Sequence, residues 1–548
     1  MKMHLSGDLQ VANQRRRRRR PTATAPAGPR AALAMMLVLC PVLARAGVPV
    51  QADSSLEARV GSLIRASVDE AYAGRLDRAL QVLDEAQALA PRDPRIGVAR
   101  YARFFENFPF GVFEKERARA QAAPLVSELT RVIGICDSIL SVDENNKAAF
   151  LYRGWAYLNR SQTYVIMRNT RPAIGDARRG KSDLDKFYAL HGQADPDAAT
   201  LLGGYLYFAD TLPGFFKFLG WLIGVPGGDR EKGLGLLEEG ATGNGLAHKD
   251  AGIVLAVTRL VFDGDIERAA VFIDERVREY PLHPWGVEYY CLLAFFYPER
   301  TAAAIEAINR ALDGWGDTVR GWEEPAHLRL LWMRARLYRQ AGRYDDALAD
   351  LDRIMESTSP WPHYVPPSAH VAAIEIEGEL GRWDAQERWC ARIPKEDERY
   401  DERRDELSRA CARTKDSTAA AVFVELGRVR EMLYRGDLAE AERLLVQAET
   451  AHGSNAGTNY LRGELARQSG RNEDALESFE RAAAMAEKAG SKGLRLQALL
   501  GLGEIYLSRG DFSSAKRRYQ KAEEIEPENT TLGAAIRARL RHIERIGD

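Results

Sequence analysis

The sequence has little cysteine. Only five cysteines occur among 548 residues, and one of them, Cys40, lies in an apolar N-terminal segment. The other four, Cys136, Cys291, Cys390 and Cys411, are dispersed, and no pair has the Cys-x-x-Cys spacing of zinc sites and redox motifs. We therefore expect no cysteine-based metal site, and we expect buried free thiols. The alternative is a disulfide between Cys390 and Cys411, which stand 21 residues apart.

The N-terminal region lacks an apolar run long enough to span a membrane. Its apolar stretch, 31–44, has 14 residues, whereas a spanning helix needs about 20. Six arginines precede it, and Ala44 and Ala46 fit the small-x-small pattern of signal-peptidase cleavage. We expect a signal peptide over residues 1–46. Because arginine outnumbers lysine 63 to 14, as in GC-rich bacterial genomes, we expect export to the periplasm. An uncleaved membrane anchor and a lipoprotein modified at Cys40 are the alternatives, although Leu39 stands where a lipoprotein signal has a small residue.

The chain also lacks an excess of positive charge. Its net charge is −1, but residues 1–46 hold nine basic groups and one acidic group. The remaining residues carry 68 basic and 77 acidic groups, a net charge of −9. Phosphate contacts need clustered lysine and arginine, so we expect no nucleic-acid partner.

Motifs that carry catalysis are missing as well. The sequence has no His-Glu-x-x-His, no Gly-x-Ser-x-Gly and no phosphate-binding Gly-x-x-x-x-Gly-Lys-Ser/Thr. The histidines are scattered, and His363 and His370 have no carboxylate at ligand spacing. We therefore expect no enzymatic activity, no metal and no cofactor.

Residues 496–529 carry a pattern of two helices joined by a tight turn. Apolar residues recur at helical spacing on both sides of Gly510, small residues at Gly503 and Ala515 allow close helix packing, and Pro527 ends the second helix. Further signature positions hold Leu502, Tyr506, Tyr519 and Ala522. With these residues the segment resembles the tetratricopeptide-repeat family.

The same frame recurs along the chain. It occurs at 456–489, 422–455, 328–361, 250–283 and 60–93, and further helical pairs span 285–312 and 370–393. The resemblance implies an all-α fold, an α-solenoid of about ten helix pairs in a right-handed superhelical array with one continuous core.

The expected organisation after the signal peptide has four parts. They are a linker at 47–59, a divergent array at 60–394, a charged linker or helix at 395–417 and a regular array at 418–548. We expect helix 532–546 to cap the last array with one apolar face. The same pattern predicts that Arg537, Arg539, Arg541 and Arg545 remain in solvent.

The divergent array contains an apolar insert at 212–228. Between Leu212 and Val225 the only charged residue is Lys217, and the stretch is too short to span a bilayer. It is either a buried helix or an interfacial segment whose aromatic residues contact lipid or a partner. These residues are Phe215, Phe216, Phe218 and Trp221. Residues 120–300 also resemble a group that includes bacterial secreted proteins and the inclusion-body-clearance family of the mitochondrial outer membrane, which implies an adaptor role.

In tetratricopeptide arrays the first helix of each pair lines the concave face. Carried over to the last three repeats, the family's inward positions hold Phe423, Leu426, Arg430, Leu433, Tyr460, Glu464, Arg467, Gln497, Leu500 and Glu504. Glu464 and Glu504 argue against the capture of a peptide carboxylate, so we expect a peptide with basic and apolar residues. The alternative is that these side chains only cover a solvated groove.

The sequence thus predicts a secreted, non-catalytic scaffold that binds protein partners. The alternative is a peripheral membrane or lipid-handling protein that uses residues 212–225.

Overall fold

The structure is a computed structural model. It describes residues 54–106, 115–167, 169–191, 195–211, 227–243, 245, 248–315, 323–357, 365–412, 415–525 and 531–547. The described residues form 24 α-helices and contain no strand, which confirms the expected all-α class. Several expectations lie outside the described residues, namely those on the signal peptide with Ala44 and Ala46, on Cys40, and on Phe215, Phe216, Phe218 and Trp221.

The first half of the described chain runs from α2 to α14. Its helices are α2 (Ser54–Tyr72), α3 (Leu76–Leu89), α4 (Pro94–Glu106), α5 (Lys115–Leu140), α6 (Lys147–Ile166), α7 (Thr170–His191), α8 (Pro196–Thr211), α10 (Arg230–Thr242), α11 (His248–Val257), the π-helical turn η2 (Thr258–Asp263), α12 (Ile266–Glu279), α13 (Pro284–Phe296), the 3₁₀ turn η3 (Pro298–Arg300) and α14 (Thr301–Trp315).

The second half runs from α15 to α26. Its helices are α15 (Glu323–Gln340), α16 (Tyr344–Glu356), α17 (Val365–Glu379), α18 (Trp383–Ala391), the 3₁₀ turn η4 (Glu398–Arg403), α19 (Arg404–Cys411), α20 (Ser417–Arg435), α21 (Leu438–His452), α22 (Ala456–Gln468), α23 (Asn472–Lys488), α24 (Lys492–Ser508), α25 (Phe512–Glu523) and α26 (Thr531–Gly547).

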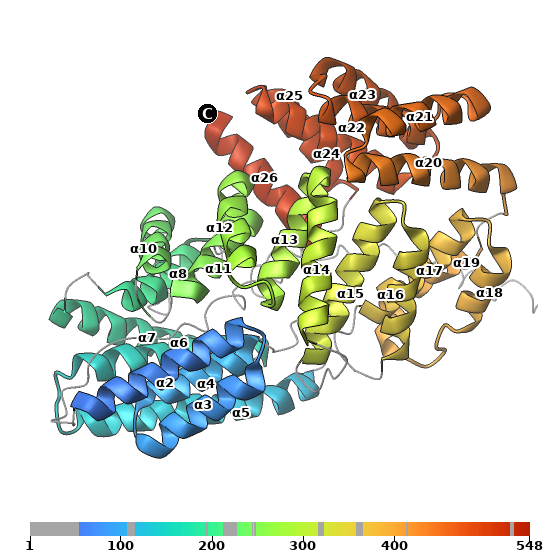
Figure 1. Cartoon of the computed structure of the whole chain (residues 1–548). Coiled ribbons are helices and arrows are strands. Elements are labelled where there is room, and N and C mark those ends of the chain that lie inside the picture. The colour runs from blue at the N-terminus through green and yellow to red at the C-terminus, as the bar shows by residue number, and fades with distance from the viewer. Residues whose placement is uncertain are drawn as a thin grey trace, which may run out of the picture.

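Each sequence repeat folds as one antiparallel helix pair, as Figure 1 shows for the C-terminal helices. In the 496–529 repeat, Gly510 joins α24 to α25 with a φ of +73°, a conformation that glycine adopts without a steric penalty. A Cβ at Gly503 would lie 2.6 Å from Cε2 of Tyr519, so α24 and α25 approach closely only because this residue is glycine. The pairing that the repeat pattern predicts is confirmed.

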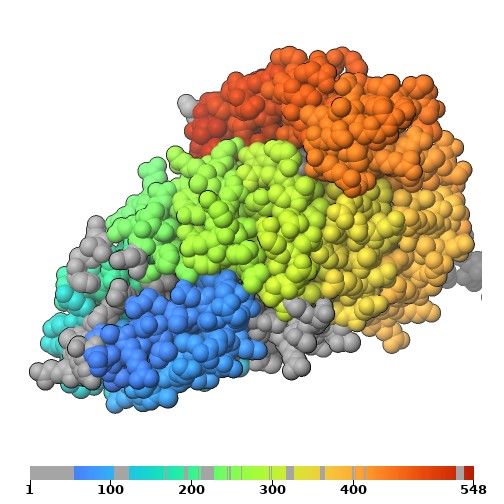
Figure 2. Space-filling model, in the orientation of Figure 1, coloured from blue at the N-terminus to red at the C-terminus, as the bar shows by residue number. Residues whose placement is uncertain are grey.

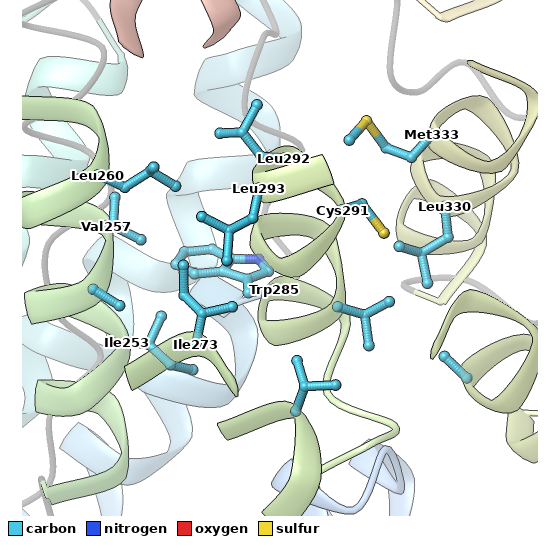
Figure 3. Close-up of a cluster of buried hydrophobic side chains, with 14 of the residues drawn as sticks. Ile253, Val257, Leu260, Ile273, Trp285, Cys291, Leu292, Leu293, Leu330 and Met333 are labelled. Atoms are coloured by element: carbon cyan, nitrogen blue, oxygen red, sulfur yellow. The ribbon is translucent and has the colours of Figure 1, made fainter. Parts of the chain in front are cut away.

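The last repeats have a hydrophobic cluster of their own within α20 to α24, so the core is not continuous as expected. A larger cluster extends along the rest of the array. Its buried residues run from Val60 in α2 to Ile543 in α26. Near the middle, Trp285, Ile273 and Leu293 pack together, as Figure 3 shows. The core continues through the segment at 395–417, where η4 and α19 pack against α17 and bury Tyr400 and Leu407.

Cys390 and Cys411 form a disulfide that links α18 to α19. The expectation of free thiols was wrong for this pair. Both helices pack against α17, and this brings the Cα atoms of Cys390 and Cys411 within 6.0 Å of each other. Cys136 and Cys291 are free and buried, as expected.

The array closes on itself. Helix α26 packs against η2, in the middle of the chain, as well as against its neighbour α25. The contact is close, because a Cβ at Gly264 would lie 2.2 Å from the carbonyl oxygen of Ala538. In Figure 2 the C-terminal part, orange to red, lies directly on the middle of the chain, green to yellow.

Arginine side chains of α26 secure this contact. Arg539, Arg541 and Arg545 donate hydrogen bonds to the carbonyls of Gly264, Phe262 and Asp263 respectively, at 2.9 to 3.2 Å. These carbonyls end η2, and helix C-termini attract positive charge. The expectation of four solvated arginines was wrong for Arg539, which is fully buried, because α26 meets a second part of the array instead of capping an open end.

Candidate binding cavity

The closed part of the array surrounds a cavity of about 1360 Å³. Helices α13, α15, α17, α20, α22 and α24 supply most of its wall, and each of them is the first helix of a pair. Aromatic side chains are frequent on the wall: Phe296, Tyr297, Trp332, Phe423, Tyr434 and Tyr460. Small-molecule pockets usually have volumes of roughly 300 to 1,000 Å³. The cavity therefore has room for a peptide segment.

Nine of the ten residues that the repeat frame assigns to the concave face lie on this wall, whereas Leu433 is buried in the core of the last repeats. The nine are Phe423, Leu426, Arg430, Tyr460, Glu464, Arg467, Gln497, Leu500 and Glu504. Their exposure differs. Gln497 is exposed to the cavity, whereas Tyr460, Glu464, Leu426 and Leu500 are buried in its wall.

The acidic side chains on the wall are paired with arginines. Arg467 lies 2.9 Å from Glu464 on its own helix and 3.0 Å from Glu299, which follows α13. Arg539 lies 2.9 Å from Glu504 of α24 and 2.6 Å from Glu267 of α12. Each arginine thus joins helices that are distant in the sequence, and the carboxylates have structural roles in addition to any role in binding.

The arginine contact shifts the ionisation of Glu267. Burial disfavours its charged form, but the hydrogen bonds and the attraction from Arg539 outweigh that effect and lower the pKa of Glu267 to about 2. Tyr297 also donates a hydrogen bond to Glu267, at 3.2 Å. The carboxylate is therefore ionised at neutral pH.

Arg430 has a different environment from Arg467 and Arg539. It donates a hydrogen bond to the hydroxyl of Tyr344 at 3.2 Å, and its guanidinium lies 5.9 Å from the centre of the Phe423 ring. Phe423 in turn stacks on Tyr344, with ring centres 4.7 Å apart. These contacts join α20 to α16 and give this part of the wall a polar group within an aromatic surface.

Sequence reasoning missed the upstream half of the wall. Arg339 lies 3.1 Å from Glu375 and 2.9 Å from Glu379, and these three residues line the cavity beside Trp332 and Arg336. The inward offsets used for the last three repeats, when applied to 328–361, point to Arg329, Trp332, Arg336 and Arg339, and all of these except Arg329 line the cavity. No local signal points to Arg539, because its partners lie 35 and 272 residues away.

The described residues contain neither a candidate metal site nor a candidate membrane span. They include no group of three or more histidine, cysteine, aspartate and glutamate side chains that could hold a metal ion. None of the helices in the described ranges is long and apolar enough to cross a membrane. His370 bonds through Nε2 to the carbonyl of Trp389 at 2.7 Å.

Stacked helix pairs around a central cavity define a helical-repeat protein. Two stretches of the chain, residues 293–360 and 454–528, match models of the tetratricopeptide repeat. Both stretches contribute to the cavity wall. The resemblance noted in the sequence is confirmed at this level.

Solved structures of other repeat proteins are similar to the chain. A tetratricopeptide repeat protein from Parabacteroides merdae is 16% identical, covers 54% of this chain and 98% of its own, and has a TM-score of 0.22. Human IFIT1, in a dimer with PPP-AAAA, is 15% identical over 84% of this chain and 94% of its own, with a TM-score of 0.29. Yeast Tom70 is 14% identical over 89% of this chain and 97% of its own, with a TM-score of 0.24. No curated protein matches the sequence.

Proposed function

We propose that this protein is a non-catalytic scaffold that binds a segment of a protein partner in the central cavity. The observation that carries the proposal is the cavity itself, with exposed Gln497 and the aromatic side chains of several inner helices on one wall. Concave surfaces of stacked repeats bind extended or helical peptides because successive pairs present side chains at regular intervals. The adaptor role implied by the resemblance of residues 120–300 belongs to the same proposal.

We further propose that the scaffold acts outside the cytoplasm, in the periplasm. The signal-like sequence at 1–46 supports export. The disulfide between Cys390 and Cys411 supports an oxidising compartment, since structural disulfides are rare in the reducing cytosol. Fractionation of the native host with an antibody to the chain tests this point, and recovery in the cytoplasm would contradict it.

Binding in the cavity is tested with twelve-residue peptides that are selected from a random phage library for binding to the full-length protein. Gln497→Trp fills part of the cavity from an exposed position on α24, so it should weaken the selected peptides at least ten-fold. Val446→Trp is the matched control, because Val446 is 50% exposed and is not part of the cavity wall. Equal affinities for the wild type and both variants would show that the peptides bind elsewhere.

A further inference from the structure

The cavity wall carries a surplus of negative charge where the array closes. We define the closure corner as Glu267, Glu299, Glu464 and Glu504 with their partners Arg467 and Arg539. The four carboxylates line the cavity, and Tyr297, two residues before Glu299, donates its hydroxyl hydrogen to Glu267 and joins the two groups.

The corner carries two more negative than positive charges. Each arginine is shared by two carboxylates, and among the described residues no other basic side chain forms an ion pair with these four glutamates. Glu267 and Glu299 are the accessible members, with side chains that are 57% and 48% exposed. Glu464 and Glu504 lie deeper, at 5% and 16%.

A second observation concerns hydrogen bonding on the same wall. Gln340 lines the cavity and donates through Nε2 to the carbonyl of Ala294, near the end of α13. Because Gln340 also hydrogen-bonds with Tyr434 of the same wall, the surplus carboxylates are the feature that favours a positively charged ligand.

We propose that the partner segment places lysine or arginine side chains at the closure corner. This inference rests on the proposed function and names the chemistry of its ligand. Ammonium and guanidinium groups supply positive charge and several donors, and they stack well on aromatic rings such as Tyr297. The cavity has room for a peptide segment, and apolar residues between the cations match the aromatic parts of the wall.

Two substitutions remove the surplus charge without leaving an arginine unpaired. In Glu299→Gln, Arg467 keeps Glu464 as a partner, and in Glu267→Gln, Arg539 keeps Glu504. A control variant, Glu440→Gln with Glu477→Gln, changes the net charge by the same amount. Those glutamates pair with Arg443 and Arg481 within their own helices, and neither lines the cavity.

The probes are three fluorescein-labelled decapeptides of alanine, leucine and phenylalanine. They differ only at two central positions, which are both lysine, both norleucine or both glutamate. We expect fluorescence anisotropy with the full wild-type chain to show about ten-fold tighter binding of the lysine peptide than of the norleucine peptide. In the Glu267→Gln/Glu299→Gln variant the preference should fall below about two-fold, and in the control variant it should persist.

Several outcomes would overturn the inference. They are equal binding of the lysine and norleucine peptides, a preference for the glutamate peptide, no binding of any probe, or a lysine preference that survives in Glu267→Gln/Glu299→Gln. The proposed function is tested separately. If Gln497→Trp still abolishes binding of the norleucine peptide, cavity binding stands even when the lysine preference fails.

Discussion

Arg539 and Glu267 form an ion pair at 2.6 Å although 272 residues separate them in the chain. The arginine side chain is fully buried, and it also bonds to Glu504 and to the carbonyl of Gly264. One side chain therefore holds three elements together: α12 with the turn before it, α24 and α26. This contact closes the array around the cavity.

Replacement of Arg539 by alanine should destabilise the protein by about 2 to 4 kcal/mol. The loss follows because Glu504, with a side chain only 16% exposed, then lacks its cationic partner, and a buried uncompensated charge is costly. Urea denaturation followed by circular dichroism measures the change. Arg481→Ala removes an exposed arginine with one i,i+4 partner and should cost less than about 1 kcal/mol. Similar losses in both variants would mean that Arg539 does not hold the closure.

The closure should weaken in acid. The pKa of Glu267 is lowered from 4.5 to about 2 in the folded protein, so its contribution is complete above pH 4.5 and is lost as the pH falls toward 2. Urea denaturation between pH 5 and pH 3 should therefore show a steeper loss of stability in the wild type than in Glu267→Gln. Glu477→Gln, which alters an exposed surface pair, should retain the wild-type slope. Parallel slopes for wild type and Glu267→Gln would contradict the assignment.

Reduction of the disulfide should destabilise the α18–α19 region. Cys390 and Cys411 close a loop of 21 residues, and loops of that length stabilise by about 3 kcal/mol when cross-linked. The double variant Cys390→Ser/Cys411→Ser should lose that stability. Dithiothreitol should lower the free energy of unfolding of the wild type but leave that of the double variant unchanged.

The two free cysteines should be unreactive in the folded protein. Cys136 and Cys291 are buried, and burial raises the pKa of both thiols, so neither should react with a thiol reagent before unfolding. A rapid reaction of either thiol in the folded protein would disagree with the structure.

Two turn glycines should respond differently to alanine. Gly342 and Gly510 have φ values of +75° and +73°, so both substitutions carry the backbone penalty of about 1 kcal/mol. A Cβ at Gly342 would lie 2.1 Å from the carbonyl oxygen of Gly427 in α20, whereas a Cβ at Gly510 has no neighbour within 4 Å. We expect Gly342→Ala to cost about 2 kcal/mol more than Gly510→Ala. Thermal or urea denaturation measures both, and equal losses would show that α15, α16 and α20 do not pack as described.

The repeat pattern predicted much of the fold and part of the site. It predicted the helix pairs correctly, because helical spacing and turn chemistry depend on residues close together in the sequence. Arg430, Tyr460 and Gln497 lie on the cavity wall for that reason. Nine of the ten inward positions lie on the cavity wall, and Leu433 does not. The same offsets also predict Trp332 and Arg339 in the 328–361 repeat. The inward positions were assigned only in the array after residue 417, because the charged segment at 395–417 indicated a boundary between two arrays.

The sequence by itself determined that this chain folds as stacked helix pairs with small residues at their contacts and glycine at many of their turns. Only the tertiary structure decided that the array closes, that Arg539 is buried instead of solvated, and that Cys390 pairs with Cys411. The physical reason is that each pair rotates by a small angle relative to the last. The sum of these angles brings η2 and α26 together, and no short stretch of sequence records that sum.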